Sequence, residues 1–472
     1  MRAHEAGALH AEGYGAPSWL AVPDDVDGLV PSLWAQTLTR GPSGALVAGG
    51  VDVRDLAAEH GTPAYVLDER DFRGRARDFA VSFDDAFRDL CGGADVYYAG
   101  KAFLCTAVAR WVVEEGLSLD TCTGGELGVA LRADVPVARI GLHGNNKSDG
   151  EIGRALDAGI GRIVIDSLTE IDRVADAATA RGIRAQVLLR VTVGVEAHTH
   201  SYIATAHEDQ KFGLSLSGGV AAQAIMRILQ RPSLELRGLH SHIGSQIFDV
   251  SGFELAARRV LELHAFVARE HGRALPELDL GGGFGVAYTT LHDPMPTSEL
   301  ARAMADIVGR ECASLGIEVP RISVEPGRAI AGPSTFTLYT VGTVKDVELD
   351  GGGVRRYVAV DGGMSDNMRT ALYDADYSCT LASRASGGRP VLGRVVGKHC
   401  ESGDIVVKDE FVAGDIAPGD LLAVPGTGAY CRSMASQYNH VPRPPVLAVR
   451  DGVSRVLLRR ETEDDLLALD VS

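Results

Sequence analysis

A lysine at the end of an apolar run is the residue with the clearest chemical potential in this sequence. Residues 96–99 are a valine, two tyrosines and an alanine, and Gly100 and Lys101 follow them. Six of the 46 basic residues are lysines, so arginine supplies most of the positive charge. A lysine amine can form a Schiff base with a carbonyl compound, which a guanidinium cannot do. Lys101 is therefore a candidate for amine chemistry, and a surface lysine that extends into water is the plainer alternative.

Clusters of polar residues and glycines follow three later apolar runs. They contain His242 and Ser245 (residues 240–246), Gly283 (residues 279–285), and the turn of Glu325, Pro326, Gly327 and Arg328. A glycine-rich turn can present its peptide N–H groups closely to an anion, because no Cβ intervenes. A histidine here could stack on a flat heteroaromatic ring, a serine could donate to a phosphate, and a carboxylate could keep a pyridine nitrogen protonated. The alternatives are a structural histidine, a tight turn and a local Glu325–Arg328 ion pair.

Further clusters lie toward the C-terminus. They contain Arg369 and Tyr373 (residues 361–374), Cys400 and Glu401 (residues 397–404), and Tyr430 at the end of a second glycine-rich turn (residues 426–430). Arg369 and Tyr373 are four residues apart and would share one face of a helix. Taken singly, each residue is ordinary, because a cysteine usually packs as a small hydrophobe and a tyrosine usually packs in the core.

The length and composition of the chain limit its domain number, its partners and its cellular compartment. A length of 472 residues suggests two domains, and 45% hydrophobic with 23% charged residues is typical of a globular chain. The net charge of −17 argues against binding to nucleic acid or to an anionic membrane surface. Seven cysteines without metal-ligand spacing, no signal peptide and no long apolar run predict a cytoplasmic protein outside the membrane.

The middle of the chain alternates between short apolar runs and longer segments, several of which have helical periodicity, such as 253–270 and 297–315. The runs are residues 96–99, 117–120, 139–143, 162–165, 186–191, 236–242, 277–280 and 321–324. Eight such units between residues 71 and 332 fit a (β/α)8 barrel of the TIM type better than an open doubly wound sheet. We therefore expect an α/β protein with a barrel over residues 71–332.

The pattern changes after the predicted barrel, where strand-like runs follow one another with turns between them. The runs are residues 336–341, 356–360, 390–396, 404–407, 420–424 and 446–459. The last run has Asp451-Gly452 near its centre, which is typical of a hairpin. We expect a mainly antiparallel β-barrel or sandwich domain over residues 333–472, joined by a strand from residues 46–70. Residues 1–45 are predicted to be an irregular arm.

In such a barrel, active sites lie at the carboxyl ends of the strands. Lys101 follows the first predicted strand, and the clusters of His242, Gly283 and Glu325 follow the sixth, seventh and eighth strands. Scattered structural motifs would have no reason to share one rim. This predicted placement favours a functional site in the barrel.

Taken together, these motifs resemble the fold-type III pyridoxal-phosphate decarboxylases of basic amino acids, and most closely the members that act on diaminopimelate in lysine biosynthesis. The resemblance covers residues from about 60 to 465. The motifs that carry it are Ala-Gly-Lys-Ala (99–102), Gly-Gly-Glu-Leu (124–127), His-Gly-Asn-Asn-Lys (143–147), His-Ser-His-Ile-Gly-Ser (240–245), Gly-Gly-Gly-Phe-Gly (281–285), Glu-Pro-Gly-Arg (325–328) and Cys-Glu-Ser-Gly-Asp (400–404). Their agreement in order and character makes chance similarity negligible.

The resemblance implies a role for each candidate residue. Lys101 would hold pyridoxal 5′-phosphate as a Schiff base, and Cys400 would return a proton after carbon dioxide leaves. The other cofactor ligands would be His242 on the ring, Glu325 on its nitrogen, and Ser245, Gly283, Pro326, Gly327, Arg328 and Tyr430. The substrate would be held by Arg328, Arg369, Tyr373, Glu401 and Tyr430. The family also implies a homodimer with shared active sites and no metal.

Residue chemistry supports diaminopimelate as the amino-acid substrate. Ornithine and lysine carry only an ammonium at the far end and offer nothing to an arginine. Diaminopimelate carries both an ammonium and a carboxylate there, so it calls for an acid and a base, which Glu401 and Arg369 can supply. The alternatives are a decarboxylase of ornithine, arginine or carboxynorspermidine, an alanine racemase-like enzyme, and a non-catalytic pyridoxal-phosphate-binding regulator. The racemase needs a tyrosine base, and the regulator would be expected to lack the lysine or the proton donor.

Overall fold

The computed structural model describes residues 15–194, 211–349 and 353–472. The chain divides into two compact units. The β unit contains residues 1–72, 286–293 and 330–472, and the barrel unit contains residues 73–285 and 294–329. The first 14 residues of the predicted arm lie outside the described residues.

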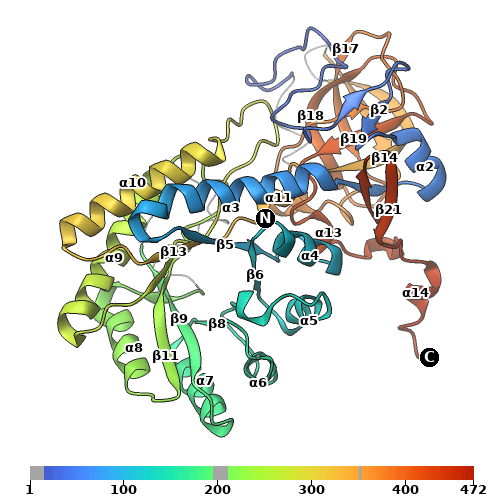
Figure 1. Cartoon of the computed structure of the whole chain (residues 1–472). Coiled ribbons are helices and arrows are strands. Elements are labelled where there is room, and N and C mark those ends of the chain that lie inside the picture. Colours follow the sequence, from blue (N-terminus) through green and yellow to red (C-terminus); the bar gives the residue numbers. More distant parts are fainter. Residues whose placement is uncertain (1–14, 195–210, 350–352) are drawn as a thin grey trace, which may run out of the picture. The chain divides into compact units, whose positions relative to one another are not determined.

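The barrel unit is built on a closed ring of parallel strands (Figure 1). In ring order the strands are β5 (Ala94–Ala99), β6 (Ser118–Thr121), β7 (Ile140–Leu142), β8 (Arg162–Ile165), β9 (Ala185–Thr192), β11 (Leu234–His240), β12 (Glu277–Asp279) and β13 (Arg321–Val324). The ring closes because β8 pairs with β9 and β13 pairs with β5. The predicted TIM-type barrel is confirmed, and each predicted strand matches one strand of the ring.

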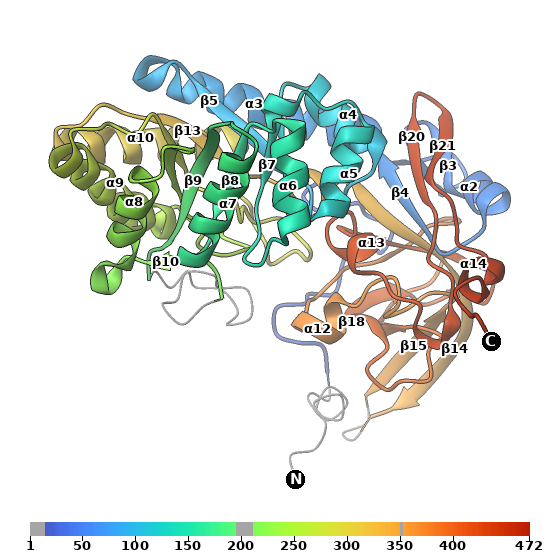
Figure 2. The ribbon, with the colours of Figure 1, turned by 90° about the horizontal axis from the view of Figure 1, so that it is seen from below.

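Helices lie outside this ring, as Figure 2 shows for α6 and α7. The helices are α3 (Glu69–Cys91), α4 (Thr106–Glu114), α5 (Gly124–Arg132), α6 (Asp149–Ala158), α7 (Leu168–Ala180), α8 (Val220–Leu229), α9 (Ser251–His271) and α10 (Thr297–Leu315). Local chemistry sets several of their ends. A capping box of Ser148 and Glu151 begins α6, Ser167 caps α7, and Gly316 ends α10 in the left-handed conformation with φ 66°. The two predicted amphipathic helices correspond to α9 and α10.

The β unit is organised around the long strand β14 (Thr335–Glu348), which pairs antiparallel with β4 (Ala64–Asp68), β15 (Val354–Val360) and β19 (Leu421–Pro425). Its other strands are β16 (Thr380–Leu381), β17 (Pro390–Val396), β18 (Ile405–Ala413), β20 (Val446–Arg450) and β21 (Val453–Leu458). Only the β15–β17 and β4–β20 pairs are parallel among the strands of this sheet, so the mainly antiparallel prediction is confirmed. The predicted hairpin joins β20 to β21 through Asp451 and Gly452, with φ values of 51° and 78°.

The described part of the N-terminal arm packs on this sheet. Trp34 is buried and its ring meets Phe336 of β14 edge-on, with centroids 6.2 Å apart, whereas Trp19 is only partly buried. Short strands β1 (Thr39–Arg40), β2 (Leu46–Ala48) and β3 (Val51–Asp52) follow, and then helix α2 (Val53–His60). Across the described residues, no helix combines the length and apolar character that crossing a membrane requires.

A buried carboxyl group, Asp366, holds together the turn between β15 and the short helix α12 (Arg369–Tyr373). The Tyr339 hydroxyl donates to its Oδ1, and the Gly363 N–H donates to its Oδ2 over 2.8 Å. Burial raises the pKa of Asp366 to about 7, although both hydrogen bonds favour the ionised form. The folded protein therefore keeps this carboxyl group partly protonated near neutral pH.

This shift predicts how pH affects stability. An unfolded aspartate releases its proton near pH 3.9, so between about pH 4 and 7 the folded state binds the extra proton. The free energy of unfolding should therefore fall as pH rises through this window, by up to a few kcal/mol from this group. Thermal unfolding of Asp366→Asn between pH 5 and 8 should lack this decline, while the exposed-site control Asp293→Asn should keep it. Parallel pH curves for Asp366→Asn and the unsubstituted protein would contradict the assignment.

Candidate active site

The barrel unit contains a cavity of about 310 Å³ at the carboxyl ends of its strands. Side chains from six strand ends converge on it. Its lining includes Lys101, Asp120, Cys122, His143, Arg190, Phe212, His242 and Glu325, together with Ala99, Gly100, Gly144 and Asn145. The structure thus brings Lys101, His242 and Glu325, from three separate sequence clusters, to one cavity of this unit.

Lys101 enters the cavity from the turn that follows β5. The Gly100 N–H donates to the Asp120 carbonyl over 3.0 Å, which ties this turn to β6. A Cβ at residue 100 would lie 2.8 Å from the same carbonyl oxygen, so only glycine allows this approach. The close contact between β5 and β6 thus fixes the backbone position from which the Lys101 side chain extends into the cavity.

His242 presents a neutral ring to the cavity. Its Nδ1 accepts a hydrogen bond from the Gly282 N–H over 3.1 Å, which fixes the ring orientation. Burial lowers the pKa of His242 well below its usual value, and the positive charges of Lys101 and Arg190 add to that effect. A neutral imidazole held in one orientation is suited to stacking on a flat ring.

Glu325 is a buried carboxylate facing two histidines. Its Oε1 lies 2.9 Å from His240 Nε2 and 3.4 Å from His143 Nε2. Burial alone would raise the pKa of Glu325, but the charges of His143 and His240 and the hydrogen bond from His240 outweigh burial and lower the pKa well below its usual value. The cavity therefore contains an ionised carboxylate where a protonated ring nitrogen could be accepted.

A second group of predicted residues lies in neighbouring loops of the same unit. The Arg328 Nη2 donates to Ser245 Oγ over 2.8 Å, which joins the loops after β11 and β13. Gly283 has φ 99°, and a Cβ there would lie 2.2 Å from the Gly244 carbonyl oxygen. Pro326 accepts a backbone hydrogen bond from Ala99 over 3.1 Å. Arg328 and Ser245 are thus joined by a side-chain hydrogen bond, and the backbone of Gly283 lies against that of Gly244.

The predicted substrate residues other than Arg328 belong to the β unit. The Arg369 side chain is buried, its Nη1 donates to the Tyr377 hydroxyl over 2.5 Å, and its guanidinium carbon lies 4.6 Å from the centre of the Tyr288 ring. Tyr373 ends α12 and is partly buried. Arg369 Nε has no hydrogen-bond partner in the described parts of the chain. A buried cation without a carboxylate partner favours the binding of an anion.

Cys400 and Glu401 are exposed residues of a turn between β17 and β18. The Cys400 N–H donates to Asn439 Oδ1 over 3.2 Å, and Glu401 Oε1 accepts from the Gly403 N–H over 3.3 Å. Tyr430 stands immediately before helix α13 (Cys431–Met434) with φ 67°, a left-handed conformation unusual for tyrosine. The backbone thus holds all three residues in defined turns.

Sequence reasoning missed several residues of the barrel site as individual candidates, namely Asp120, Cys122, His143, Arg190, Phe212 and His240. His143 and His240 lie inside motifs that the sequence singles out, but no role was predicted for them. Asp120 and His143 end two of the predicted strands, so the rule that carboxyl ends of barrel strands form the site would have indicated both.

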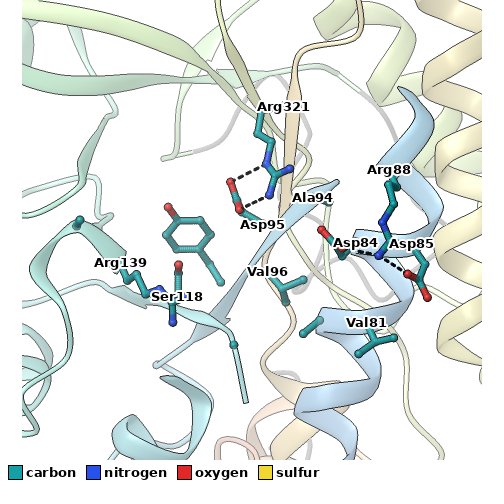
Figure 3. A pocket seen from close by; sticks show the side chains of 14 residues that line it. Val81, Asp84, Asp85, Arg88, Ala94, Asp95, Val96, Ser118, Arg139 and Arg321 are labelled. Carbon is teal, nitrogen blue, oxygen red and sulfur yellow. Dashed lines mark hydrogen bonds and ion pairs between the residues drawn. The ribbon is translucent and has the colours of Figure 1, made fainter. Parts of the chain in front are cut away.

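A larger pocket lies at the opposite, amino-terminal ends of the barrel strands (Figure 3). It has a volume of about 510 Å³ and contains none of the predicted site residues. Two of its arginines are already paired: Arg321 with Asp95 at 2.8 Å, and Arg88 with Asp85 at 2.5 Å. This pocket is thus lined by local ion pairs rather than by the predicted site residues.

Known proteins resemble this chain both in its barrel region and over its whole length. Residues 77–332 match the family model described as the pyridoxal-dependent decarboxylase, pyridoxal binding domain. The diaminopimelate decarboxylase of Mycobacterium leprae is 53% identical over the full length of both chains. That of Mycobacterium bovis is 56% identical over 94% of this chain and 98% of its own. The crystal structure of the M. jannaschii diaminopimelate decarboxylase in complex with L-lysine is similar with a TM-score of 0.86 and 29% identity, covering 93% of this chain and 99% of that one.

The accessibility of Cys400 gives a testable expectation. It is the exposed member of seven free cysteines, and burial raises the pKa of Cys122 to about 12 and of Cys312 to about 11, which disfavours their reactive thiolates. A thiol reagent should therefore modify one cysteine in a fast phase that Cys400→Ser removes. The control Cys91→Ser should keep the fast phase, and its persistence in Cys400→Ser would show that another thiol is responsible.

Proposed function

We propose that this chain, which belongs to the pyridoxal-dependent decarboxylases and within them to the diaminopimelate decarboxylases, removes carbon dioxide from meso-2,6-diaminopimelate and releases L-lysine. One observation carries the proposal. An amine, an oriented neutral imidazole and an ionised carboxylate line one cavity of about 310 Å³ in the barrel unit. These groups fit the aldehyde, the ring face and the ring nitrogen of pyridoxal 5′-phosphate.

Each side chain of the barrel site would hold one part of the cofactor. Lys101 would bind the aldehyde through its amine, His242 would pack on the ring, and Glu325 would accept a hydrogen bond from the ring nitrogen. The phosphate would be held by Ser245, Gly283 and Arg328, where positive φ at the glycine and the Arg328–Ser245 hydrogen bond already shape a cradle. Bound pyridoxal phosphate supplies an electron sink for the electron pair that departing carbon dioxide leaves on the α carbon.

The β-unit residues would complete the reaction. The Cys400 Sγ–H would give its proton to the α carbon after the bond to the carboxyl carbon breaks, and solvent would restore that proton. The exposed position of the Cys400 turn agrees with a group that acts beyond its own unit. We infer a homodimer in which this turn enters the partner's barrel, as the resemblance implies. The seven free thiols agree with a reducing, cytoplasmic location.

Arg369 would select the substrate. Its buried guanidinium contacts the Tyr377 hydroxyl and the Tyr288 ring rather than a carboxylate, so a substrate carboxylate would supply the missing charge. A hydrogen bond to a charged group contributes roughly 1.5–3 kcal/mol. Ornithine and lysine lack a distal carboxylate and would leave the guanidinium unpaired, whereas diaminopimelate would pair with it. Glu401 would receive the distal ammonium.

The first test measures L-lysine formation from meso-diaminopimelate with added pyridoxal phosphate. We expect the unsubstituted enzyme to form lysine and to show visible absorbance from the bound cofactor. Lys101→Arg keeps a positive charge but cannot form the imine, so it should lose both the absorbance and the activity, as Lys101→Ala should. A visible spectrum that survives in both variants would exclude Lys101 as the attachment point.

The second test concerns Arg369. Arg369→Gln removes the charge while keeping most of the side-chain length, so kcat/KM for diaminopimelate should fall by roughly 10–10⁴-fold. Any weak activity on lysine or ornithine should change far less, because those substrates offer no carboxylate to this position. The exposed Arg389 provides the control variant Arg389→Gln, which should leave both activities unchanged. Equal losses on all substrates in Arg369→Gln would remove Arg369 from the specificity role.

A further inference from the structure

The interior of the barrel contains charged side chains where branched apolar residues usually pack. Arg162 of β8 lies at their centre, with Nη2 donating to Asp279 of β12 over 2.5 Å and Nη1 donating to Ser323 of β13 over 3.0 Å. The same Nη2 lies 3.8 Å from Asp120 Oδ1. Burying this many charges is costly unless each has a partner, so the arrangement calls for a function.

The chain of contacts continues from Asp120 to the cavity. His143 Nε2 lies 3.1 Å from Asp120 Oδ1 and 3.4 Å from Glu325 Oε1, so one imidazole lies between two carboxylates. His240 Nε2 approaches the same Glu325 oxygen to 2.9 Å. Both histidines therefore contact Oε1. The Glu325 side chain also lines the cavity, so the two histidines lie against a carboxylate that faces the bound ligand.

We propose that Asp120 and His143 are positioning residues that hold Glu325 ionised and oriented so that its carboxylate meets the nitrogen of the cofactor ring. The proposal rests on the proposed function, which assigns Glu325 to that nitrogen. Asp120 orients His143, His143 and His240 hold Oε1, and Arg162 compensates the charge of Asp120 from the other side. Neither Asp120 nor His143 needs to touch the reacting atoms.

Electrostatics shows why the imidazole is needed. Two buried carboxylates this close would disfavour ionisation of each other. Burial raises the pKa of Asp120, and it opposes the charge on His143, yet the two carboxylates outweigh burial and raise the pKa of His143. The other titratable or charged groups that influence Glu325 or are influenced by it are Cys122, Arg190 and His242. A positive His143 between the two acids thus lets Glu325 remain an anion.

The same atoms suggest one competing interpretation. His143, His240 and Glu325 form the group of ligand atoms that could hold a metal ion in the described part of the chain, with those atoms within 4.8 Å of one another. Two imidazoles and a carboxylate suit a transition metal. A proton on His143 would also compensate the two carboxylates, without a metal ion. A metal analysis of the purified holoenzyme distinguishes the protonated histidine from a metal site.

The test compares four holoenzymes: the unsubstituted protein, His143→Gln, Glu325→Gln and the double variant. Cofactor release on dilution gives the dissociation constant, and visible absorbance from pH 6 to 10 reports the protonation of the bound cofactor. We expect His143→Gln to raise the dissociation constant on the order of 10–100-fold, as loss of an orienting partner does elsewhere. The absorbance midpoint should move in the direction seen in Glu325→Gln but less far. The double variant should match Glu325→Gln, because His143 acts through Glu325.

Control variants make each outcome decisive. His264→Gln removes another buried histidine of the barrel unit, which contacts the Glu277 carbonyl and not the cavity, and it should leave the absorbance midpoint unchanged. Asp120→Asn should shift the midpoint as His143→Gln does. If Glu325→Gln shifts the midpoint while His143→Gln behaves like His264→Gln, the positioning role is wrong and the assignment of Glu325 stands. An unchanged midpoint in Glu325→Gln would overturn the assignment itself, and one equivalent of metal that is lost in His143→Gln would replace the proposal with a metal site.

Discussion

Closure of the parallel barrel is the constraint on which the site depends. Pairing of β13 with β5 and of β8 with β9 brings strand ends separated by more than 200 residues in the sequence to one rim. Each of these ends contributes only one or two polar side chains, and no one of them would form a site alone. Close backbone approach, as between Gly100 and the Asp120 carbonyl, then limits each side chain to one direction. The cavity is a consequence of the ring rather than of any one motif.

Charge compensation inside the ring is the second requirement. Charges of alternating sign run from the barrel interior to the cavity, in the order Asp279, Arg162, Asp120, His143 and Glu325, so each buried charge has an opposite neighbour. Removing one member would leave its neighbours unpaired in a region of low dielectric constant, which is more costly than losing the whole set. Glu325 is therefore kept ionised by the charges of the barrel interior and not only by its own immediate contacts.

The sequence predicted the elements better than it predicted the site. Apolar runs between turn residues located all eight barrel strands, because a buried parallel strand leaves a continuous apolar signature. Lys101 was predicted because lysine is scarce and this one ends an apolar run, and His242 and Glu325 were predicted because they lie in polar, glycine-containing clusters after later runs. Asp120 had only its place at a strand end to indicate it, and Arg162 had no signal, since each is a lone charge in a short strand and its partners come from other strands. Only the closed ring shows that these charges neutralise one another.

Arg369 shows the same limit in the β unit. Its helix spacing with Tyr373 was visible in the sequence, but its enclosure by Tyr377 and by Tyr288, 81 residues earlier, was not. That enclosure changes the argument about substrate choice. An exposed arginine would keep its hydration and tolerate a missing partner at little cost, whereas a guanidinium packed against aromatic rings has lost most of that hydration. A substrate without a distal carboxylate would leave the Arg369 guanidinium buried and unpaired, and the cost of that unpaired charge disfavours its binding. A buried polar site rejects a ligand that lacks one group in the same way.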